Sequence, residues 1–329
     1  MTQIYAYKSI AKAALNQYDL ADEKIQFLGH SENVTFCVEA AAEKFLLRIH
    51  QPVSASQDDI WQQPDIIESE LLWLAALHRD RNINVVVQKP IQNQQGEWVT
   101  QVLADNKDIF CCSLLRWIDG NISETRRTSQ QAHQLGLIIA QLHQHSSQWK
   151  LPQNFIRPTY DENRLHAALE ALYPAVSNNL ISAEHYELLT TATHYIETTM
   201  KTLGRSQHWG LIHADLHESN YLFDNQQIRP IDFSRCGFGY YLYDLAQSID
   251  HFLPQIRSSF FAGYQTIRNL PDNYLQITEG FSIMASIEVF AFHANNPKEH
   301  EWLSNTVKYV AQKHIPKFLQ GESFLLDII

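Results

Sequence analysis

Two short stretches decide the fold of this chain: Leu211-Ile-His-Ala-Asp-Leu-His-Glu-Ser-Asn-Tyr-Leu-Phe223 and, a little further on, Ile231-Asp-Phe233. The first begins as a short apolar strand that delivers Asp215 into a loop. Asn220 leaves that loop just before a second apolar strand, and Asp232 closes a third. Strands in this order, joined by turns, are expected to gather the three polar side chains at one edge of a small hairpin.

The three gathered side chains suit phosphoryl transfer. This reaction needs a carboxylate that accepts the proton of the nucleophile, and hard oxygen ligands that hold Mg²⁺ against the nucleotide phosphates. Asp215 has the chemistry of the base, and Asn220 and Asp232 have the chemistry of the metal ligands. The residues therefore predict an ATP- and Mg²⁺-dependent phosphotransferase.

The spacing His213-x-Asp215-x-x-x-x-Asn220, followed by Asp232 between Ile and Phe, resembles the aminoglycoside phosphotransferase/choline kinase superfamily. This superfamily includes homoserine-kinase-like and stress-response-kinase-like members. The resemblance implies an α+β, protein-kinase-like bilobal fold with ATP and Mg²⁺ as cofactors. Ala214 stands where most regulated protein kinases have Arg, so no switch through a phosphorylated activation loop is expected. In the family, an Asp at the position of Asp244 braces the catalytic loop.

The resemblance extends upstream and implies a nucleotide site in the first third of the chain. The family's nucleotide loop corresponds to Gly29-His-Ser-Glu-Asn33, its phosphate-binding base to Arg48 and its helical carboxylate partner to Glu70. Backbone groups of the hinge would hydrogen-bond adenine. The nucleotide-binding residues implied in this way are Gly29, Ser31, Asn33, Arg48, Glu70, Trp117 and Ile118.

Arg48 departs from the protein-kinase pattern, which has Lys at this position. A guanidinium can hold a phosphate and the Glu70 carboxylate together. Arg and Lys nevertheless differ in the geometry of their hydrogen bonds. The role of Arg48 is therefore a prediction that needs its own test.

Hydrophobic periodicity predicts a sheet-rich first part and a helical remainder. The expected division is a five-stranded nucleotide-binding lobe over residues 1–117 and a helical catalytic and acceptor-binding lobe over residues 118–329. The candidate strands are 24–28, 34–40, 44–49, 85–88, 98–102 and 109–117, six ranges of which five are expected to form the sheet of this lobe. The helices are expected over 5–18, 66–77, 129–146 and 183–203, the last ending before Gly204.

Composition and charge exclude several classes of protein. The net charge of −11 with no cluster of Lys and Arg argues against nucleic-acid binding. No apolar run approaches the length of a membrane span, and no signal peptide is recognised, so a cytoplasmic location is expected. The four cysteines have no CxxC spacing and are expected to be free and buried. Nothing in the pattern indicates an oligomeric state.

Three alternatives remain open on the sequence alone. A Ser/Thr protein kinase of the same fold is the nearest one. A metal-dependent hydrolase is the second, because His213, Asp215 and His217 alternate and would share one face of an extended strand. A catalytically inactive binding module is the third, although all three catalytic positions are present.

The acceptor is expected to be a small molecule with a hydroxyl group. Protein kinases have a long segment after the metal-binding Asp on which a peptide docks, whereas here only Phe233 to Tyr241 separates Asp232 from the next apolar helical run. Asp250 and Glu288 in the same part of the chain would favour an acceptor that also has an amino group.

Overall fold

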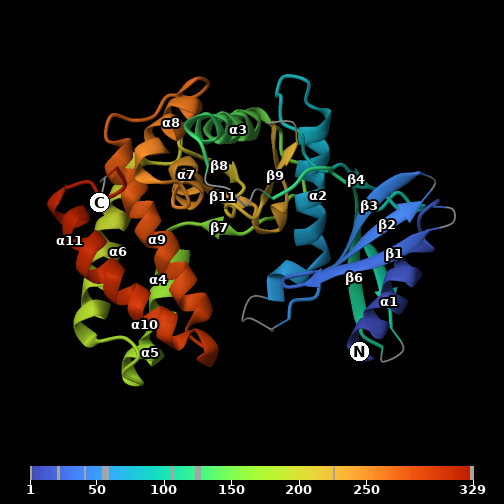
Figure 1. Cartoon of the computed structure of the whole chain (residues 1–329), viewed down its shortest axis with the longest axis horizontal. Helices are drawn as coiled ribbons and strands as arrows, with labels where there is room; N and C mark the ends of the chain where they lie inside the picture. Colours follow the sequence, from blue (N-terminus) through green and yellow to red (C-terminus); the bar gives the residue numbers. More distant parts are fainter. Residues whose placement is uncertain are drawn as a thin grey trace. The chain divides into compact units, whose positions relative to one another are not determined.

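The computed structural model describes residues 2–20, 23–40, 42–53, 59–104, 107–122, 127–224 and 227–326. The chain folds into two compact units, each coloured along the sequence in Figure 1. The first unit contains residues 1–120, 150–157 and 229–234, and the second contains 121–149, 158–228 and 235–329. The lobe boundary was predicted at residue 117. In the structure the first unit also includes the two short later segments 150–157 and 229–234.

The first unit is built on an antiparallel sheet of six strands in the order β1-β2-β3-β6-β4, with β5 also paired to β6. The lobe was predicted with five strands, and the predicted strand over 85–88 does not form. In this region only the two residues of β4, shortly after the predicted range, pair with β6. The strands are β1 (Lys24–His30), β2 (Val34–Ala40), β3 (Glu43–Ile49), β4 (Pro90–Ile91), β5 (Thr100–Leu103) and β6 (Ile109–Arg116).

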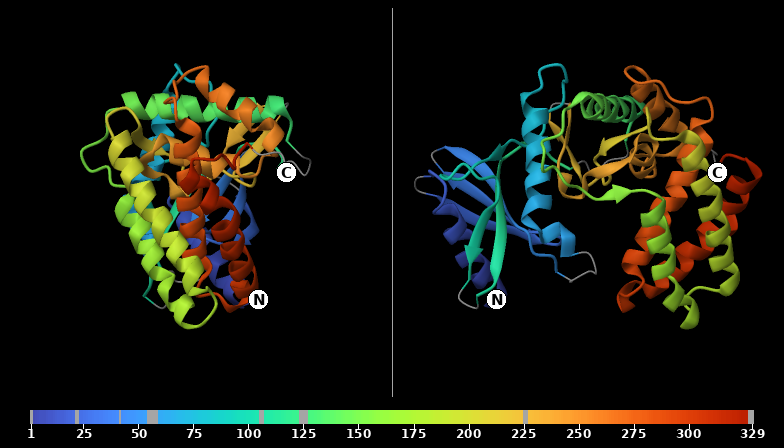
Figure 2. Two further views of the ribbon diagram at one scale, coloured as in Figure 1. Left: turned by 90° about the vertical axis from the view of Figure 1, so that its left-hand side faces the viewer. Right: turned by 180° about the vertical axis from the view of Figure 1, so that it is seen from behind.

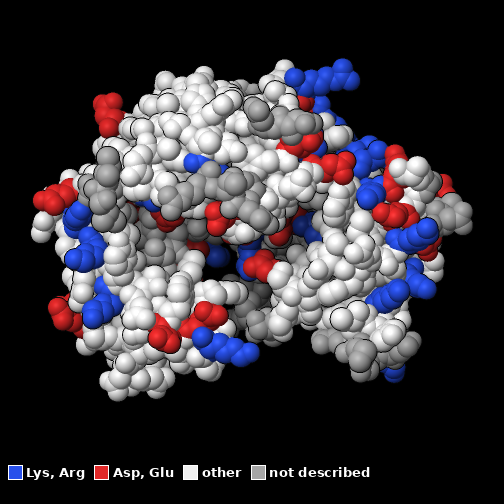
Figure 3. Space-filling view, in the orientation of Figure 1, with Lys and Arg blue, Asp and Glu red and all other residues white. Residues whose placement is uncertain are grey.

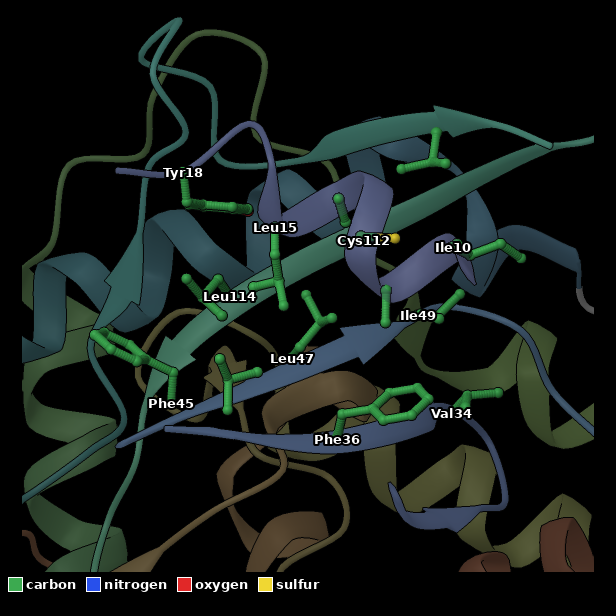
Figure 4. Close-up of a cluster of buried hydrophobic side chains, with 14 of the residues drawn as sticks. Ile10, Leu15, Tyr18, Val34, Phe36, Phe45, Leu47, Ile49, Cys112 and Leu114 are labelled. Carbon is green, nitrogen blue, oxygen red and sulfur yellow. The ribbon is translucent and has the colours of Figure 1, made fainter. Parts of the chain in front are cut away.

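A hydrophobic core lies between this sheet and helix α1 (Thr2–Leu15). Figure 4 shows Leu47 and Leu114 of the sheet beside Leu15 of the helix, with Phe36 in the same cluster. Helix α1 begins and ends about one turn earlier than the predicted range 5–18. Tyr18 lies beyond the helix end and is still buried, where its hydroxyl accepts a hydrogen bond from Thr100.

Helix α2 (Pro64–Arg79) also belongs to the first unit. It begins with Pro64, a residue that suits the first turn because its missing N–H would have no helical partner. Ile67, Leu71 and Leu74 recur at helical spacing and are buried. The predicted helix over 66–77 is therefore confirmed, and it is two residues longer at each end.

The second unit is mainly helical and contains a small sheet in the order β7-β11-β8. Strand β9 and the first two residues of β10, its hairpin partner, also belong to this unit, whereas the last two residues of β10 belong to the first. The two predicted helices are α3, which starts with a capping box of Thr128 and Gln131, and α6, which ends at Gly204 with φ 66°. The strands are β7 (Thr159–Tyr160), β8 (Trp209–Ile212), β9 (Tyr221–Asp224), β10 (Gln227–Pro230) and β11 (Gly237–Tyr240). The helices are α3 (Ser129–Gln148), α4 (Glu162–Ala171), α5 (Tyr173–Ser177), α6 (Ala183–Leu203), α7 (Tyr241–Ile249), α8 (Pro254–Gln265), α9 (Tyr274–His293), α10 (His300–Tyr309) and α11 (Ile315–Gln320).

Helix α9 is the central helix of this unit. It packs against α4, α6 and α7, and the two further views of Figure 2 show it among them from other sides. It is the one helix in the described residues that is long and apolar enough to cross a membrane. However, 61% of its most apolar window is buried inside the protein. This burial is what a core helix of a folded domain shows.

The surface and the cysteines agree with the composition. The face in Figure 3 has acidic and basic side chains interspersed rather than gathered in one patch of a single sign. All four cysteines are free and buried, as the sequence predicted.

Candidate active site

The loop after β8 holds Asp215, and Asp244 of α7 determines the path of its backbone. The Asp244 carboxylate accepts hydrogen bonds from the main-chain N–H groups of His213 (3.0 Å) and Ala214 (2.7 Å). Ala214 has φ 62°, a left-handed conformation that costs energy for any residue other than glycine. The two hydrogen bonds offset this cost, and the predicted bracing role of Asp244 is confirmed.

Asp244 is in turn held by His143 of α3, whose Nε2 lies 2.9 Å from the carboxylate. Both side chains are fully buried. Burial would raise the pKa of Asp244, but the hydrogen bonds that it accepts from His143 and from the Ala214 N–H bring this pKa below its usual value. Burial lowers the pKa of His143 despite Asp244. A neutral imidazole therefore donates to the carboxylate through Nε2 and accepts from the Tyr264 hydroxyl through Nδ1.

Asn220 orients the Asp215 carboxylate within the same loop. Its side-chain nitrogen donates to the main-chain oxygen and to Oδ2 of Asp215, both at 2.9 Å. The Asp215 side chain is 35% exposed, so a substrate can reach it, while Asn220 is almost completely buried. The nitrogen is occupied within the loop, so the amide oxygen of Asn220 is the end of the side chain that remains for a cation.

The hydrolase alternative fails on the geometry of this loop. His213, Asp215 and His217 were expected on one face, but the left-handed Ala214 interrupts the alternation of an extended strand. The His213 side chain is fully buried, whereas that of His217 is 46% exposed. Among the described residues, no three His, Cys, Asp or Glu side chains lie close enough together to hold a metal ion.

The first unit contributes a second cluster of charged residues. Arg48 on β3 donates from Nη2 to Oε1 of Glu70 on α2 at 2.7 Å, and both side chains are buried. Nη1 of Arg48 lies 3.8 Å from Oδ1 of Asp232. The predicted pairing of Arg48 with Glu70 is therefore present. The Asp232 side chain is 42% exposed, so its carboxylate remains accessible.

The predicted nucleotide loop is the β1-β2 hairpin. Gly29 does not have a left-handed backbone, and a Cβ added there would meet only the Thr35 hydroxyl, at 4.0 Å. The fold therefore does not require glycine here, and the open space would admit a ligand close to the backbone. The Ser31 N–H is bonded to the Asn33 carbonyl, so in this conformation it points into the hairpin. Asn33 is buried.

The predicted hinge follows β6. The Trp117 N–H donates to the Lys44 carbonyl at 2.9 Å and so cannot also contact adenine. The expected adenine contacts are thereby narrowed to the Trp117 carbonyl and the backbone of Ile118. Their role in nucleotide binding stays a prediction.

Two buried polar residues were given no functional role by the sequence. His143 lies on the apolar face of α3, and Arg157 lies in the segment 150–157 of the first unit. A histidine in line with Leu135, Ile139 and Leu142 signals a buried polar partner, but it does not say which one. For Arg157 no local signal exists, because its partners are distant in the sequence.

Two side chains, one in each unit, have the oxygen atoms that a divalent cation of the Mg²⁺ type prefers. Asn220 offers an amide oxygen, and Asp232 offers a carboxylate. Besides its contact with Arg48, the Asp232 carboxylate accepts a hydrogen bond from the N–H of Ser234 at 3.4 Å, a weak contact that leaves lone pairs for a ligand. Hard oxygen donors of this kind are the ligands that Mg²⁺ prefers.

The fold and these residues define a kinase-like phosphotransferase. The chain belongs to the phosphotransferase enzyme family, whose model matches residues 24–277. The superfamily resemblance, the α+β kinase-like fold and the assignment as an enzyme are thereby confirmed.

Relatives and solved structures agree with this assignment. The structure of a microcompartment-associated aminopropanol kinase is similar at TM-score 0.77 and 26% identity, covering 97% of this chain and 99% of the other. An amicoumacin kinase in complex with AMP-PNP and Ca²⁺ has TM-score 0.76 at 19% identity, with 95% of each chain covered. The amicoumacin kinase of Bacillus subtilis is 22% identical over 247 residues, which is 74% of this chain and 68% of that protein.

Proposed function

We propose that the protein transfers the γ-phosphate of ATP to a hydroxyl group of a small molecule, with Asp215 as the general base. The observation that supports this most is the loop around Asp215. Its carboxylate is partly exposed, is held by Asn220, and stands on a backbone tied down by Asp244. A base must be both reachable and oriented to take a proton in the transition state.

In this proposal each of these residues has its own role. Asp215 accepts the proton of the acceptor hydroxyl at its carboxylate, and the Asn220 amide keeps that carboxylate oriented. Asn220 and Asp232 would hold Mg²⁺, which neutralises phosphate charge when it is bound with the nucleotide. Arg48, oriented by Glu70, would hold the nucleotide phosphates.

A nucleotide site in the first unit is supported by two observations. Gly29 leaves room beside the hairpin backbone, and the Arg48 guanidinium is already oriented by a buried carboxylate. The amicoumacin kinase of similar fold binds the ATP analogue AMP-PNP together with a divalent cation. We infer that Gly29, Ser31 and Asn33 face the nucleotide phosphates, and that Trp117 and Ile118 face the adenine.

The acceptor proposed is a small hydroxyl compound that also has an amino group. Between Asp232 and α7 the structure has only a short turn, Phe233–Arg235, and the four-residue strand β11. This leaves no long segment on which a peptide could dock. The similar structures include an aminopropanol kinase and an amicoumacin kinase, and both names describe small-molecule acceptors.

The decisive experiment compares wild type with Asp215→Asn. With radiolabelled ATP, purified protein would be screened against amino alcohols, choline, homoserine, aminoglycosides and a generic protein acceptor. We expect a small hydroxyl compound to be labelled, and Asp215→Asn to reduce the rate by about 10²–10⁴-fold while nucleotide-induced stabilisation persists. Activity of Asp215→Asn within about threefold of wild type would remove Asp215 as the base. Labelling of protein serine alone would favour a protein kinase.

From its cysteines we propose that the protein is located in a reducing compartment. All four are buried thiols without a disulfide, and burial raises the pKa of Cys111 and Cys112, which keeps them unreactive. This is consistent with a cytoplasmic enzyme.

A further inference from the structure

Arg157 joins two parts of the first unit that hold proposed functional residues. Its Nη1 donates to the carbonyl of Ile66 near the start of α2, at 2.9 Å. Its Nη2 donates to the carbonyl of Ser234, two residues after Asp232, at 2.5 Å. The arginine is buried. One planar group therefore connects the helix of Glu70 with the loop of Asp232.

Two neighbouring contacts strengthen the same connection. The N–H of Ile156 donates to the hydroxyl of Ser69, the residue before Glu70, at 3.0 Å. The ring of Phe233, the residue after Asp232, packs edge-on against Trp73 of α2 with centroids 5.5 Å apart. Together with the hydrogen bonds of Arg157, these contacts connect α2 with the loop of Asp232 at several neighbouring residues.

Asp232 needs such support because its own backbone is strained. Its φ is 59°, a left-handed conformation that an aspartate adopts only at a cost. Such conformations persist where the surrounding structure enforces them. The direct contact with Arg48, at 3.8 Å, is too long to do so alone. The carbonyl that Arg157 holds belongs to Ser234, the second residue after Asp232, so a change in the φ of Asp232 would displace this carbonyl.

We propose that Arg157 is a positioning residue for the metal-binding carboxylate of Asp232. This inference rests on the proposed function, in which Asp232 is a ligand of Mg²⁺. By holding Ile66 and Ser234 together, Arg157 keeps Asp232 in its left-handed conformation beside the Arg48–Glu70 pair. Loss of Arg157 lets the loop relax and weakens the cation site.

The test compares Arg157→Met and Arg157→Lys with wild type. The apparent constant for Mg²⁺ would be measured in two ways: from turnover at saturating ATP, and from the Mg²⁺ dependence of the melting shift that ATP induces. Residues that orient metal ligands typically change metal affinity by about 10–100-fold. We expect Arg157→Met to raise the Mg²⁺ constant at least ~10-fold, with a smaller change in the limiting rate at saturating Mg²⁺. The Mg²⁺ constant of Arg157→Lys should lie between those of wild type and Arg157→Met, because the single ammonium group of lysine cannot reproduce both hydrogen bonds of the guanidinium.

Arg257→Met is the matched control. Arg257 lies in the second unit and also binds main-chain carbonyls, those of Phe252 (2.9 Å) and Leu325 (2.8 Å). It should lose stability like Arg157→Met and keep the wild-type Mg²⁺ constant. Should Arg157→Met fail to fold, the folded Arg157→Lys provides the comparison. A Mg²⁺ constant within about twofold of wild type in the folded Arg157 variants would overturn the inference.

Asp232→Ala separates this inference from the proposed function. If Asp232→Ala loses the Mg²⁺ response and the Arg157 variants keep it, only the positioning role is wrong. If Asp232→Ala itself keeps the wild-type response, the assignment of Asp232 as a metal ligand fails and the role of Arg157 fails with it.

Discussion

At the scale of single residues, the unusual feature is Arg48 in place of a lysine. Two of its nitrogens face different carboxylates, Glu70 at 2.7 Å and Asp232 at 3.8 Å. A lysine has a single charged nitrogen and cannot keep both geometries. The guanidinium therefore suits a position where one side chain meets two carboxylates.

The first prediction concerns Arg48→Lys and Arg48→Ala. Arg48→Lys should keep part of the activity, because charge survives, with an ATP KM raised several-fold. Arg48→Ala should raise KM by about 10–100-fold, the equivalent of one lost charged hydrogen bond. Steady-state kinetics over a range of ATP concentrations measure both. Unchanged kinetics of Arg48→Ala would show that this strand does not hold the phosphates.

A control is needed because Arg48→Ala leaves Glu70 buried without its partner, at a cost of about 3–5 kcal/mol in stability. The double variant Arg48→Ala/Glu70→Gln removes the unpaired charge. It should recover melting temperature while the high KM remains.

At the scale of elements, helices α3 and α8 cross at two glycines. A Cβ on Gly136 would overlap the carbonyl oxygen of Phe260, and one on Gly263 would overlap that of His133. Backbone cannot move aside as a flexible side chain does, so the helices approach this closely only without a Cβ. The crossing also brings Tyr264 of α8 to His143 of α3, and thereby supports Asp244.

The corresponding prediction is that Gly136→Ala destabilises the protein by about 1–3 kcal/mol, although alanine is the better helix former. The overlap forces α3 and α8 apart. Gly280→Ala is the matched control, since its Cβ would meet the Phe318 side chain at 3.1 Å, and a ring can shift. Urea unfolding measures both. Equal stability of the two variants would contradict the close crossing.

At the scale of the whole molecule, several histidines are held neutral by burial. Burial lowers the pKa of His251 to about 3, with Arg127, His217 and Arg257 acting in the same direction. Burial also lowers the pKa of His314 to about 4. The unfolded chain takes up these protons near pH 6.5 while the folded chain resists them.

Stability should therefore decrease as pH falls. The contribution of a group with a lowered folded pKa is complete above the unfolded pKa and is lost on the way down to the folded one. Between about pH 6.5 and pH 3, His251 alone contributes up to ~1.4 kcal/mol per pH unit. We expect His251→Gln to reduce the slope of the unfolding free energy against pH by the amount that corresponds to the uptake of about one proton on unfolding. Parallel curves for His251→Gln and wild type would refute the role of His251.

Local pattern predicted much of this molecule. The apolar frames around Asp215, Asn220 and Asp232, the helical periodicity of α2, α3 and α6 and the glycine after α6 follow from short-range propensity and burial. Phosphoryl transfer follows from the types and order of the three polar residues. The strand expected over 85–88 failed, since β-branched residues alone do not supply a partner strand.

Only the tertiary structure decided which polar groups meet. Spacing along an extended strand would place His213 on the face of Asp215. The main-chain N–H groups of His213 and Ala214 instead donate to Asp244, the backbone at Ala214 is left-handed, and His213 is buried. The partners of Arg157 are equally far away in the sequence. A buried polar group must find a partner wherever the packed chain offers one, and local periodicity holds no record of that partner.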